Sequence, residues 1–159
     1  ALNLTIKKLY NITTEIKWPN DIYFSDKKIA GILCQMQNNF VIAGIGLNVN
    51  QENFPDEIKD IASSLLLITG IKVELFIVLS VFLNYFENAV NTLCSEGFYP
   101  IKDEILKHFY LMDKEVDIES PKKTIHGIVK GMDENGQLLV EVSGKKIKKI
   151  MAGDVHVCF

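Results

Sequence analysis

Apolar residues recur at helical spacing in several stretches of the chain. Over residues 1–10 they share one face, with lysines on the other, which predicts the last turns of an amphipathic helix. A longer apolar stripe predicts a helix over about 73–95, and a shorter helix is predicted over about 100–110. Ser63 is placed to cap a short helix that ends at about residue 69. We expect the long stripe to lie in the core, because packing alone accounts for it.

Two other regions carry short β-favouring runs. In the first, turn residues separate four runs, at 14–17, 22–24, 29–37 and 40–49, which predict consecutive antiparallel strands. In the second, alternating runs and a tight turn at 133–136 predict a small five-stranded barrel. We therefore predict an α+β protein with two domains, residues 1–112 and residues 113–159.

The charge of the chain limits what it can bind. All seventeen basic residues are lysines, and twenty acidic residues give a net charge of −3. A strongly basic surface for nucleic acid is not expected from this balance, so we predict no nucleic-acid binding through this chain. Without arginine, the chain has no guanidinium to grip a phosphate or a carboxylate with two parallel hydrogen bonds. An anion must be held by lysine, by backbone amides or by another piece of protein.

Cysteine and histidine spacing gives no sign of a metal site. Cys34, Cys94 and Cys158 are widely separated, which predicts free thiols in a reduced, cytoplasmic protein. We expect Cys34, within a predicted strand, to be a buried structural thiol. The three histidines also lack ligand spacing and are assigned no role. The longest apolar stretch, residues 75–83, is far shorter than the roughly 20 residues of a membrane-spanning helix, so no membrane contact is predicted.

The residues with the clearest chemistry lie around the first predicted strands, in segments 17–21, 27–33 and 43–50. Lysines and an aspartate stand at strand ends, and glycines interrupt two neighbouring strands, where a ligand can approach the backbone closely. An anionic group joined to an apolar body fits this pattern. The alternative stays open that the charges are solvated strand ends and the glycines mark bulges. A dinucleotide-binding G-x-G-x-x-G turn is excluded, because the third glycine is missing.

These segments together resemble the biotin protein ligases, also called biotin–acetyl-CoA-carboxylase ligases. The matching motifs are Lys17-Trp18-Pro19-Asn20-Asp21, Lys28-Ile29-Ala30-Gly31-Ile32-Leu33 and residues 44–48, followed in family order by Ser63-Ser64-Leu65, Gly131-Met132-Asp133 and Gly153-Asp154. The resemblance covers essentially the whole chain. It implies part of a catalytic domain with a mixed sheet and packed helices, related to class II aminoacyl-tRNA synthetases, followed by a small SH3-like barrel.

The resemblance also implies a two-step reaction. Biotin and Mg-ATP would give biotinyl-5′-AMP and pyrophosphate, and biotin would then pass to a lysine of the biotin carboxyl carrier protein of acetyl-CoA carboxylase. By position, Lys28 matches the lysine that contacts the biotin carboxylate and the α-phosphate, and Asp21 matches an acidic residue that can hold Mg²⁺ beside the phosphates. Further matched positions line the biotin pocket (Gly31, Ile32, Gly44 and Gly46) or the nucleotide site (Lys17, Asn20, Asn48 and Asp154).

One departure from the family pattern concerns the beginning of the chain. Family members carry a Gly-Arg-Gly-Arg-type loop and residues for the ureido ring of biotin upstream of the lysine motif, and this sequence has neither. We therefore expect the C-terminal half of a ligase. The upstream residues either belong to the protein beyond this sequence or are absent from it, and in the second case we expect no ligase activity. The alternatives are a non-catalytic ligase-like fragment that forms a homodimer or docks a carrier through residues 33–39, and a lipoyl or octanoyl transferase that uses a thioester without ATP.

Overall fold

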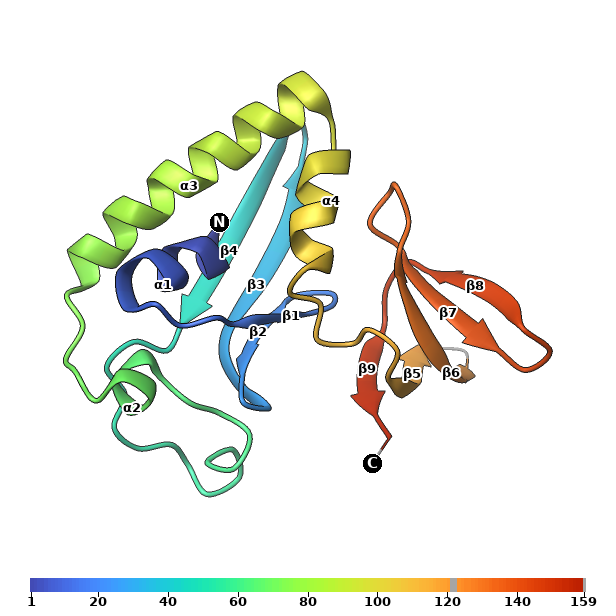
Figure 1. Ribbon diagram of the computed structural model, residues 1–159, viewed down its shortest axis with the longest axis horizontal. Helices are drawn as coiled ribbons and strands as arrows, with labels where there is room; N and C mark the ends of the chain where they lie inside the picture. Colours follow the sequence, from blue (N-terminus) through green and yellow to red (C-terminus); the bar gives the residue numbers. More distant parts are fainter. Residues whose placement is uncertain (121–122, 159) are drawn as a thin grey trace. The chain divides into compact units, whose positions relative to one another are not determined.

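The computed structural model describes residues 1–120 and 123–158 (Figure 1). Its elements are α1 (Leu2–Tyr10), β1 (Glu15–Lys17), β2 (Asp21–Phe24), β3 (Lys27–Gln37), β4 (Phe40–Leu47), α2 (Leu65–Thr69), α3 (Leu75–Glu96), α4 (Tyr99–Leu106), β5 (Glu115–Ser120), β6 (Lys123–Met132), β7 (Leu138–Val142), β8 (Lys146–Ile150) and β9 (Asp154–Val157). The chain divides into two compact units. The first holds residues 1–16 and 20–89, and the second holds residues 17–19 and the chain from Val90 onward.

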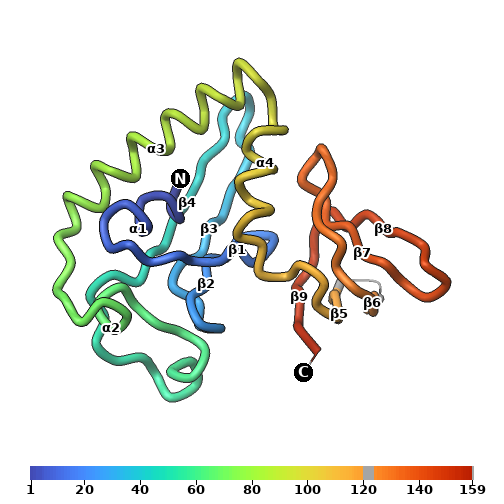
Figure 2. Tube along the Cα trace, in the orientation of Figure 1, coloured from blue at the N-terminus to red at the C-terminus, as the bar shows by residue number. Residues whose placement is uncertain are grey.

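The first unit is built on a four-stranded sheet in the order β1-β2-β3-β4. Strands β2, β3 and β4 are antiparallel neighbours, and β3 and β4 form the long hairpin seen in Figure 2. The β2–β3 register opposes Asp21 to Gly31 and Tyr23 to Lys28, with an irregularity between Ile22 and Tyr23. The predicted antiparallel strands are therefore confirmed.

The core of the first unit gathers apolar side chains from the sheet, the three helices that contribute to this unit and two connecting segments. Its fully or nearly buried members are Leu2, Ile6, Ile22, Ile29, Ala30, Val49, Leu65, Val73 and Val78. Ile6, Ile29 and Leu65 have no exposed surface at all. Burying aliphatic side chains of this size contributes about 1.5–3 kcal/mol each, which fixes α1 and α2 against the start of β3.

The short helix α2 begins one residue later than the sequence predicts. Ser64, rather than Ser63, is the N-cap, and its Oγ accepts a hydrogen bond from the Leu67 amide at 3.2 Å while donating to the Gln51 carbonyl at 2.7 Å. The Ser63 amide instead donates to the Lys28 carbonyl at 2.9 Å, so that residue is held in place by the start of β3. Gly70 ends the helix in the left-handed conformation, with φ 69°.

The long helix differs from its predicted role. Among the described residues of α3, only Val78 is buried, although Phe82 packs partly against the core. Eight large apolar residues of the helix are 40–85% exposed: Leu75, Phe76, Ile77, Leu79, Leu83, Phe86, Val90 and Leu93. The expectation that the whole stripe is core is therefore wrong for this chain, because helical spacing identifies an apolar face and does not say what covers it. By length and composition α3 also meets the requirement for a membrane-spanning helix, and little of it is buried, which corrects the expectation that its apolar stretch is far too short.

The second unit carries the five-stranded antiparallel sheet predicted for the end of the chain, in the order β8-β7-β6-β5-β9. Its interior is formed by alternate residues of neighbouring strands, with Val116, Ile118, Val129, Leu138 and Val140 fully buried. The predicted tight turn is present: the Gly136 amide donates to the Asp133 carbonyl at 3.1 Å, and Gly136 has φ 76°. The boundary at residue 112 stays a prediction.

Candidate functional site

Lys28 and Asp21 form an ion pair in the first unit. The Lys28 Nζ lies 2.7 Å from the Asp21 Oδ1, and the two side chains are 44% and 24% exposed. Asp21 begins β2 and Lys28 is the second residue of β3, so two adjacent antiparallel strands bring them together. The pair is half-buried, so the ammonium is held in one place and its other protons remain available to an anion.

A segment outside the sheet fixes the backbone of Lys28. The Lys28 amide donates to the Ile61 carbonyl at 2.8 Å, and the Ser63 amide donates to the Lys28 carbonyl at 2.9 Å. Residues 28 and 62 thus form an isolated parallel bridge. The lysine is therefore anchored on both sides, by β2 and by this connecting segment, and its side chain leaves a rigid backbone position.

Beside this ion pair, glycines leave part of the sheet without side chains. Gly31 is opposite Gly46, and Leu33 is opposite Gly44, in the β3–β4 register. A Cβ on Gly31 would stand 3.3 Å from the Lys28 Cε and Nζ and 3.6 Å from the Asp21 Oδ1, so the missing side chain makes room for the pair. The predicted lysine, aspartate and glycines therefore share one face, where an apolar ligand can lie on backbone with its anionic end toward Lys28.

Three further predicted residues have mainly structural contacts. The Ile32 amide donates to the Asn20 carbonyl at 2.8 Å, which closes the turn before β2 onto β3. Strand alternation puts the Ile32 side chain on the face opposite Gly31. Asn48 donates through Nδ2 to the Ser63 carbonyl at 3.0 Å, and its backbone carbonyl accepts the Leu65 amide. Asn48 thereby ties the end of β4 to the segment that anchors Lys28.

The two remaining predicted residues, Lys17 and Asp154, belong to the second unit. Their place beside the nucleotide stays a prediction. In the same unit, Trp18 is buried, and its indole Nε1 donates to the Gly136 carbonyl at 3.0 Å. The residue that follows Lys17 is therefore a packed corner of the second unit.

Tyr23 lies on β2, two residues after Asp21. The pKa of Tyr23 is raised, first by burial and then by the Asp21 carboxylate, so this phenol stays protonated beside the ion pair.

Cys34 is exposed, which corrects the expectation of a buried thiol. The reason is that β3 extends beyond the core at its second half, where residues 34 to 37 are all exposed.

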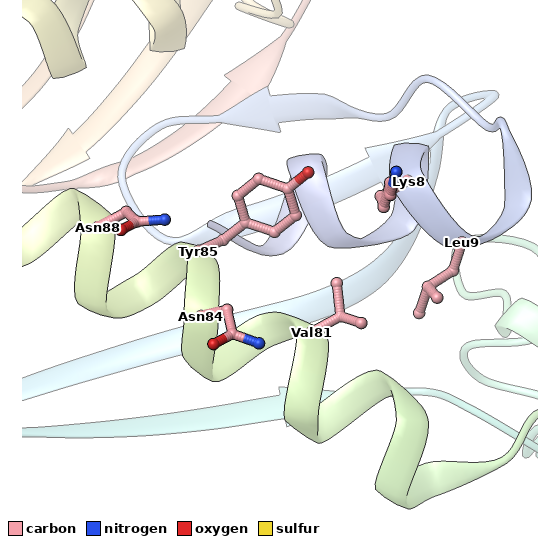
Figure 3. Close-up of a pocket in the computed structure, with 6 residues that line it drawn as sticks. All are labelled: Lys8, Leu9, Val81, Asn84, Tyr85 and Asn88. Atoms are coloured by element: carbon pink, nitrogen blue, oxygen red, sulfur yellow. The ribbon is translucent and has the colours of Figure 1, made fainter.

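A pocket also lies between α1 and α3, in the first unit (Figure 3). It is lined by Lys8, Leu9, Val81, Asn84, Tyr85 and Asn88. None of the residues predicted to bind biotin or nucleotide is among them. The candidate ligand surface is therefore the glycine face beside Lys28 and not this pocket.

Sequence reasoning missed how Ile61 and Ser64 support the site. The Ile61 carbonyl accepts the Lys28 amide, and the Ser64 hydroxyl, which caps α2, donates to the Gln51 carbonyl; both bonds join residues more than ten positions apart. The pair of serines before an apolar run was the one local signal, since serines at that place cap helices.

Comparisons with known proteins agree with the motifs. Residues 1–51 match the family described as "Biotin/lipoate A/B protein ligase family", and residues 112–157 match "Biotin protein ligase C terminal domain". The chain is 38% identical over 161 residues to the bifunctional ligase/repressor BirA of Bacillus subtilis and 31% identical over 150 residues to the biotin–[acetyl-CoA-carboxylase] ligase of Mycobacterium tuberculosis. These alignments cover 96% and 89% of the chain and 49% and 52% of the relatives, so the chain spans about half of their length.

The chain covers a larger share of a solved structure than of these relatives. The apo biotin protein ligase of Aquifex aeolicus superposes with a TM-score of 0.91 at 30% identity, covering 99% of this chain and 70% of that one. The same ligase in complex with biotin and ATP gives a TM-score of 0.90 at 30% identity, covering 99% of this chain and 67% of that one. The α+β fold with an SH3-like C-terminal domain is thus confirmed. The chain is 30% identical to the Aquifex aeolicus ligase over 99% of its own length and 70% of that protein's, and both family matches agree, so the chain belongs to the biotin protein ligase family.

Proposed function

We propose that the protein is an ATP-dependent biotin protein ligase that forms biotinyl-5′-AMP and then transfers biotin to a lysine of a biotin carboxyl carrier protein. The observation that carries this proposal is the Lys28–Asp21 pair, 2.7 Å apart at the end of the glycine face. An ammonium beside bare backbone suits a ligand with an apolar body and a carboxylate end, as biotin has. The Aquifex aeolicus relative, which shares this fold, has been crystallised with biotin and ATP.

In the first step, the biotin carboxylate attacks the α-phosphorus of ATP and pyrophosphate leaves. Two anions must approach each other, and negative charge builds on the phosphorus oxygens. Lys28 is held by Asp21 and by the backbone bonds to Ile61 and Ser63, so its charge offsets this repulsion with little reorganisation. Gly31 gives the ammonium its space. In the second step, the amine of the carrier lysine attacks the acyl carbon and AMP leaves.

Mg²⁺ fits the site as a partner of ATP. The ion prefers oxygen ligands, keeps several waters and is usually bound through one or two carboxylates together with substrate phosphates. Asp21 offers one carboxylate, of which Oδ1 faces Lys28, and its side chain is 24% exposed. We propose Asp21 as that ligand. The bound ion would supply positive charge to the phosphate oxygens, while Asp21 also keeps Lys28 in position.

By family position, Asn20 and Asn48 are proposed to contact the nucleotide. Gly31, Gly44 and Gly46 are proposed to line the biotin site, with Ile32 supporting it from the opposite face of β3 through its bond to the Asn20 carbonyl. In the second unit, Lys17 and Asp154 are proposed to bind nucleotide. The fixed carbonyl of Asn20 and the anchored side chain of Asn48 support rigid positions for these two asparagines. We also propose a cytoplasmic location without membrane or nucleic-acid contact through this chain, which accords with its net charge of −3.

The test compares two adjacent lysines in the complete gene product. Lys28→Ala removes the charge beside Asp21, whereas Lys27→Ala removes an exposed ammonium that donates to the Lys59 carbonyl at 3.3 Å. Biotin-dependent exchange of labelled pyrophosphate into ATP should fall by about 10²–10³-fold in Lys28→Ala, the usual loss for one donor aimed at developing charge. Lys27→Ala should keep the parent rate. Normal exchange in Lys28→Ala would contradict the proposed role.

A second candidate function is a non-catalytic module that forms a homodimer or docks a carrier through β3 and β4. The observation that favours it is the exposed apolar surface of this hairpin, where Leu33, Met36, Phe40, Val41 and Ile42 are 53–77% exposed. Exposed apolar surface of this kind marks interaction sites. Sedimentation of the 159-residue chain, together with its intact mass and a carrier-labelling assay, separates the two functions. A monomer without carrier affinity would remove the module.

A further inference from the structure

A group of metal-binding side chains gathers on one face of the second unit. Asp117 on β5 is directly opposite His126 on β6 and opposite His156 on β9. Residue 158 follows β9 on the same face, and its amide donates to the Glu115 carbonyl at 2.9 Å. In the sequence these residues are up to forty-one positions apart, which is why their spacing shows no ligand pattern. The sheet register brings them together.

The donor atoms of this group are already close. His126 Nδ1 lies 2.9 Å from Asp117 Oδ1, and Cys158 Sγ lies 3.6 Å from Asp117 Oδ2. One donor atom from each of Asp117, His126 and Cys158 lies within 4.8 Å of the others. Tetrahedral zinc, with bonds of about 2.0 Å to oxygen and nitrogen and 2.3 Å to sulfur, separates its oxygen and sulfur ligands by about 3.5 Å. The present oxygen–sulfur distance, which involves Oδ2, therefore matches. The 2.9 Å contact of His126 Nδ1 involves the other oxygen, Oδ1, so the Asp117 carboxylate would turn to bring one oxygen to both partners, within a cluster that already spans no more than 4.8 Å.

The histidine is also oriented for coordination. His126 Nε2 lies 2.9 Å from Glu115 Oε1, so a hydrogen bond from Nε2–H to this carboxylate leaves Nδ1 for a cation. A carboxylate that accepts from the second ring nitrogen is the usual companion of a metal-bound histidine, because it fixes the ring and its tautomer. Here Glu115 and Asp117 are two residues apart on β5, and therefore on the same face of the strand.

We propose that Asp117, His126 and Cys158 form a binding site for a zinc-class divalent cation, with Glu115 positioning His126. The donor set of one oxygen, one nitrogen and one sulfur selects Zn²⁺ or a similar borderline metal over Mg²⁺ or Ca²⁺, which prefer oxygen alone. Binding would replace the protons that now lie between the three side chains, and those protons would pass to solvent. Water or His156 would complete the coordination. The proposal uses other residues than the Mg-ATP chemistry proposed around Lys28 and Asp21, and it does not depend on that chemistry.

The test uses the 159-residue chain and Co²⁺ as a spectroscopic probe in place of zinc. A thiolate bound to Co²⁺ gives a charge-transfer band in the near ultraviolet, and four-coordinate Co²⁺ absorbs strongly in the visible. We expect both bands at one equivalent of Co²⁺, and we expect Zn²⁺ to abolish them by displacement. Cys158→Ser should remove the charge-transfer band, and Asp117→Asn should weaken cobalt binding.

Matched controls make the result specific. Cys94→Ser removes an exposed cysteine from α3, and His108→Gln removes a histidine outside the group, so both should keep the bands unchanged. Glu115→Gln should weaken Zn²⁺ binding by roughly 10- to 100-fold, as expected for loss of the carboxylate behind a metal-bound histidine. Circular dichroism of each variant shows whether it folds. The proposal is overturned if the parent chain gives no charge-transfer band, or if the band survives in folded Cys158→Ser.

Discussion

Gly31→Ala tests whether the bare backbone at this position serves the ion pair beside it. The added Cβ would stand 3.3 Å from the Lys28 Cε and Nζ, closer than ordinary contact, so the lysine head must shift by a few tenths of an ångström. Because the Lys28 side chain is 44% exposed, it can move outward, and the free energy of unfolding should change by less than about 1 kcal/mol. A misplacement of about 1 Å costs roughly 100-fold in rate, so this smaller shift should slow biotin adenylation by about 3- to 10-fold.

The assay is biotin-dependent pyrophosphate exchange in the complete gene product, with thermal unfolding measured on the same samples. The single variants Gly31→Ala and Lys28→Ala are compared with the double variant. If Gly31 acts by making room for Lys28, the glycine substitution should cost nothing further once the lysine side chain is gone. The reasoning is refuted if the two losses simply multiply, or if Gly31→Ala leaves the exchange rate unchanged.

Three further predictions concern stability and use urea or thermal unfolding of the chain. Leu65→Ala, at a position with no exposed surface, should lower the free energy of unfolding by about 2–5 kcal/mol, and a loss well below this range would mean that α2 is not fixed on the core. Ser64→Ala should cost about 1–2 kcal/mol by removing the N-cap of α2, more than the control Ser63→Ala, and equal losses would contradict this assignment. The hydrogen bond from Lys149, together with two backbone amides, lowers the pKa of Asp133. The ionised carboxylate therefore stabilises the fold above the ordinary aspartate pKa of about 3.9, and this stabilisation is lost as pH falls through the lowered pKa. Asp133→Asn should therefore flatten the acid side of the melting-temperature profile, and an unchanged profile would count against the ion pair.

The elements of the fold were predictable because their signals are local. Apolar spacing located α1 and α3 to within about two residues, and turn residues separated the first four strands. The pair of Lys28 and Asp21 also followed from the sequence, through the motif that resembles the ligase family. Their distance did not, because it depends on the β2–β3 register and on an irregularity between Ile22 and Tyr23.

The expectations that were wrong, and the contacts that were not predicted, share a different cause: the exposure of a side chain and its neighbours in space depend on tertiary structure. The apolar stripe of α3 and the thiol of Cys34 were both expected inside the protein, yet both are largely exposed in the described chain. Histidine spacing along the chain gave no reason to join His126 with Cys158. Only the pairing of β5 with β6 and β9 puts these side chains on one face.

The parallel bridge between Lys28 and Ala62 has a consequence for how the site opens. The Lys28 amide is bonded to the connecting segment and not to a sheet strand, so this segment can detach in a local unfolding event while β3 and β4 stay paired. Amide hydrogen exchange at Lys28 and Ser63 would then be faster than at the amides that pair β3 with β4, and the difference would report the free energy of opening. A ligand that contacts Lys28 would slow exchange at these two amides first, well before it changed the melting temperature of the sheet.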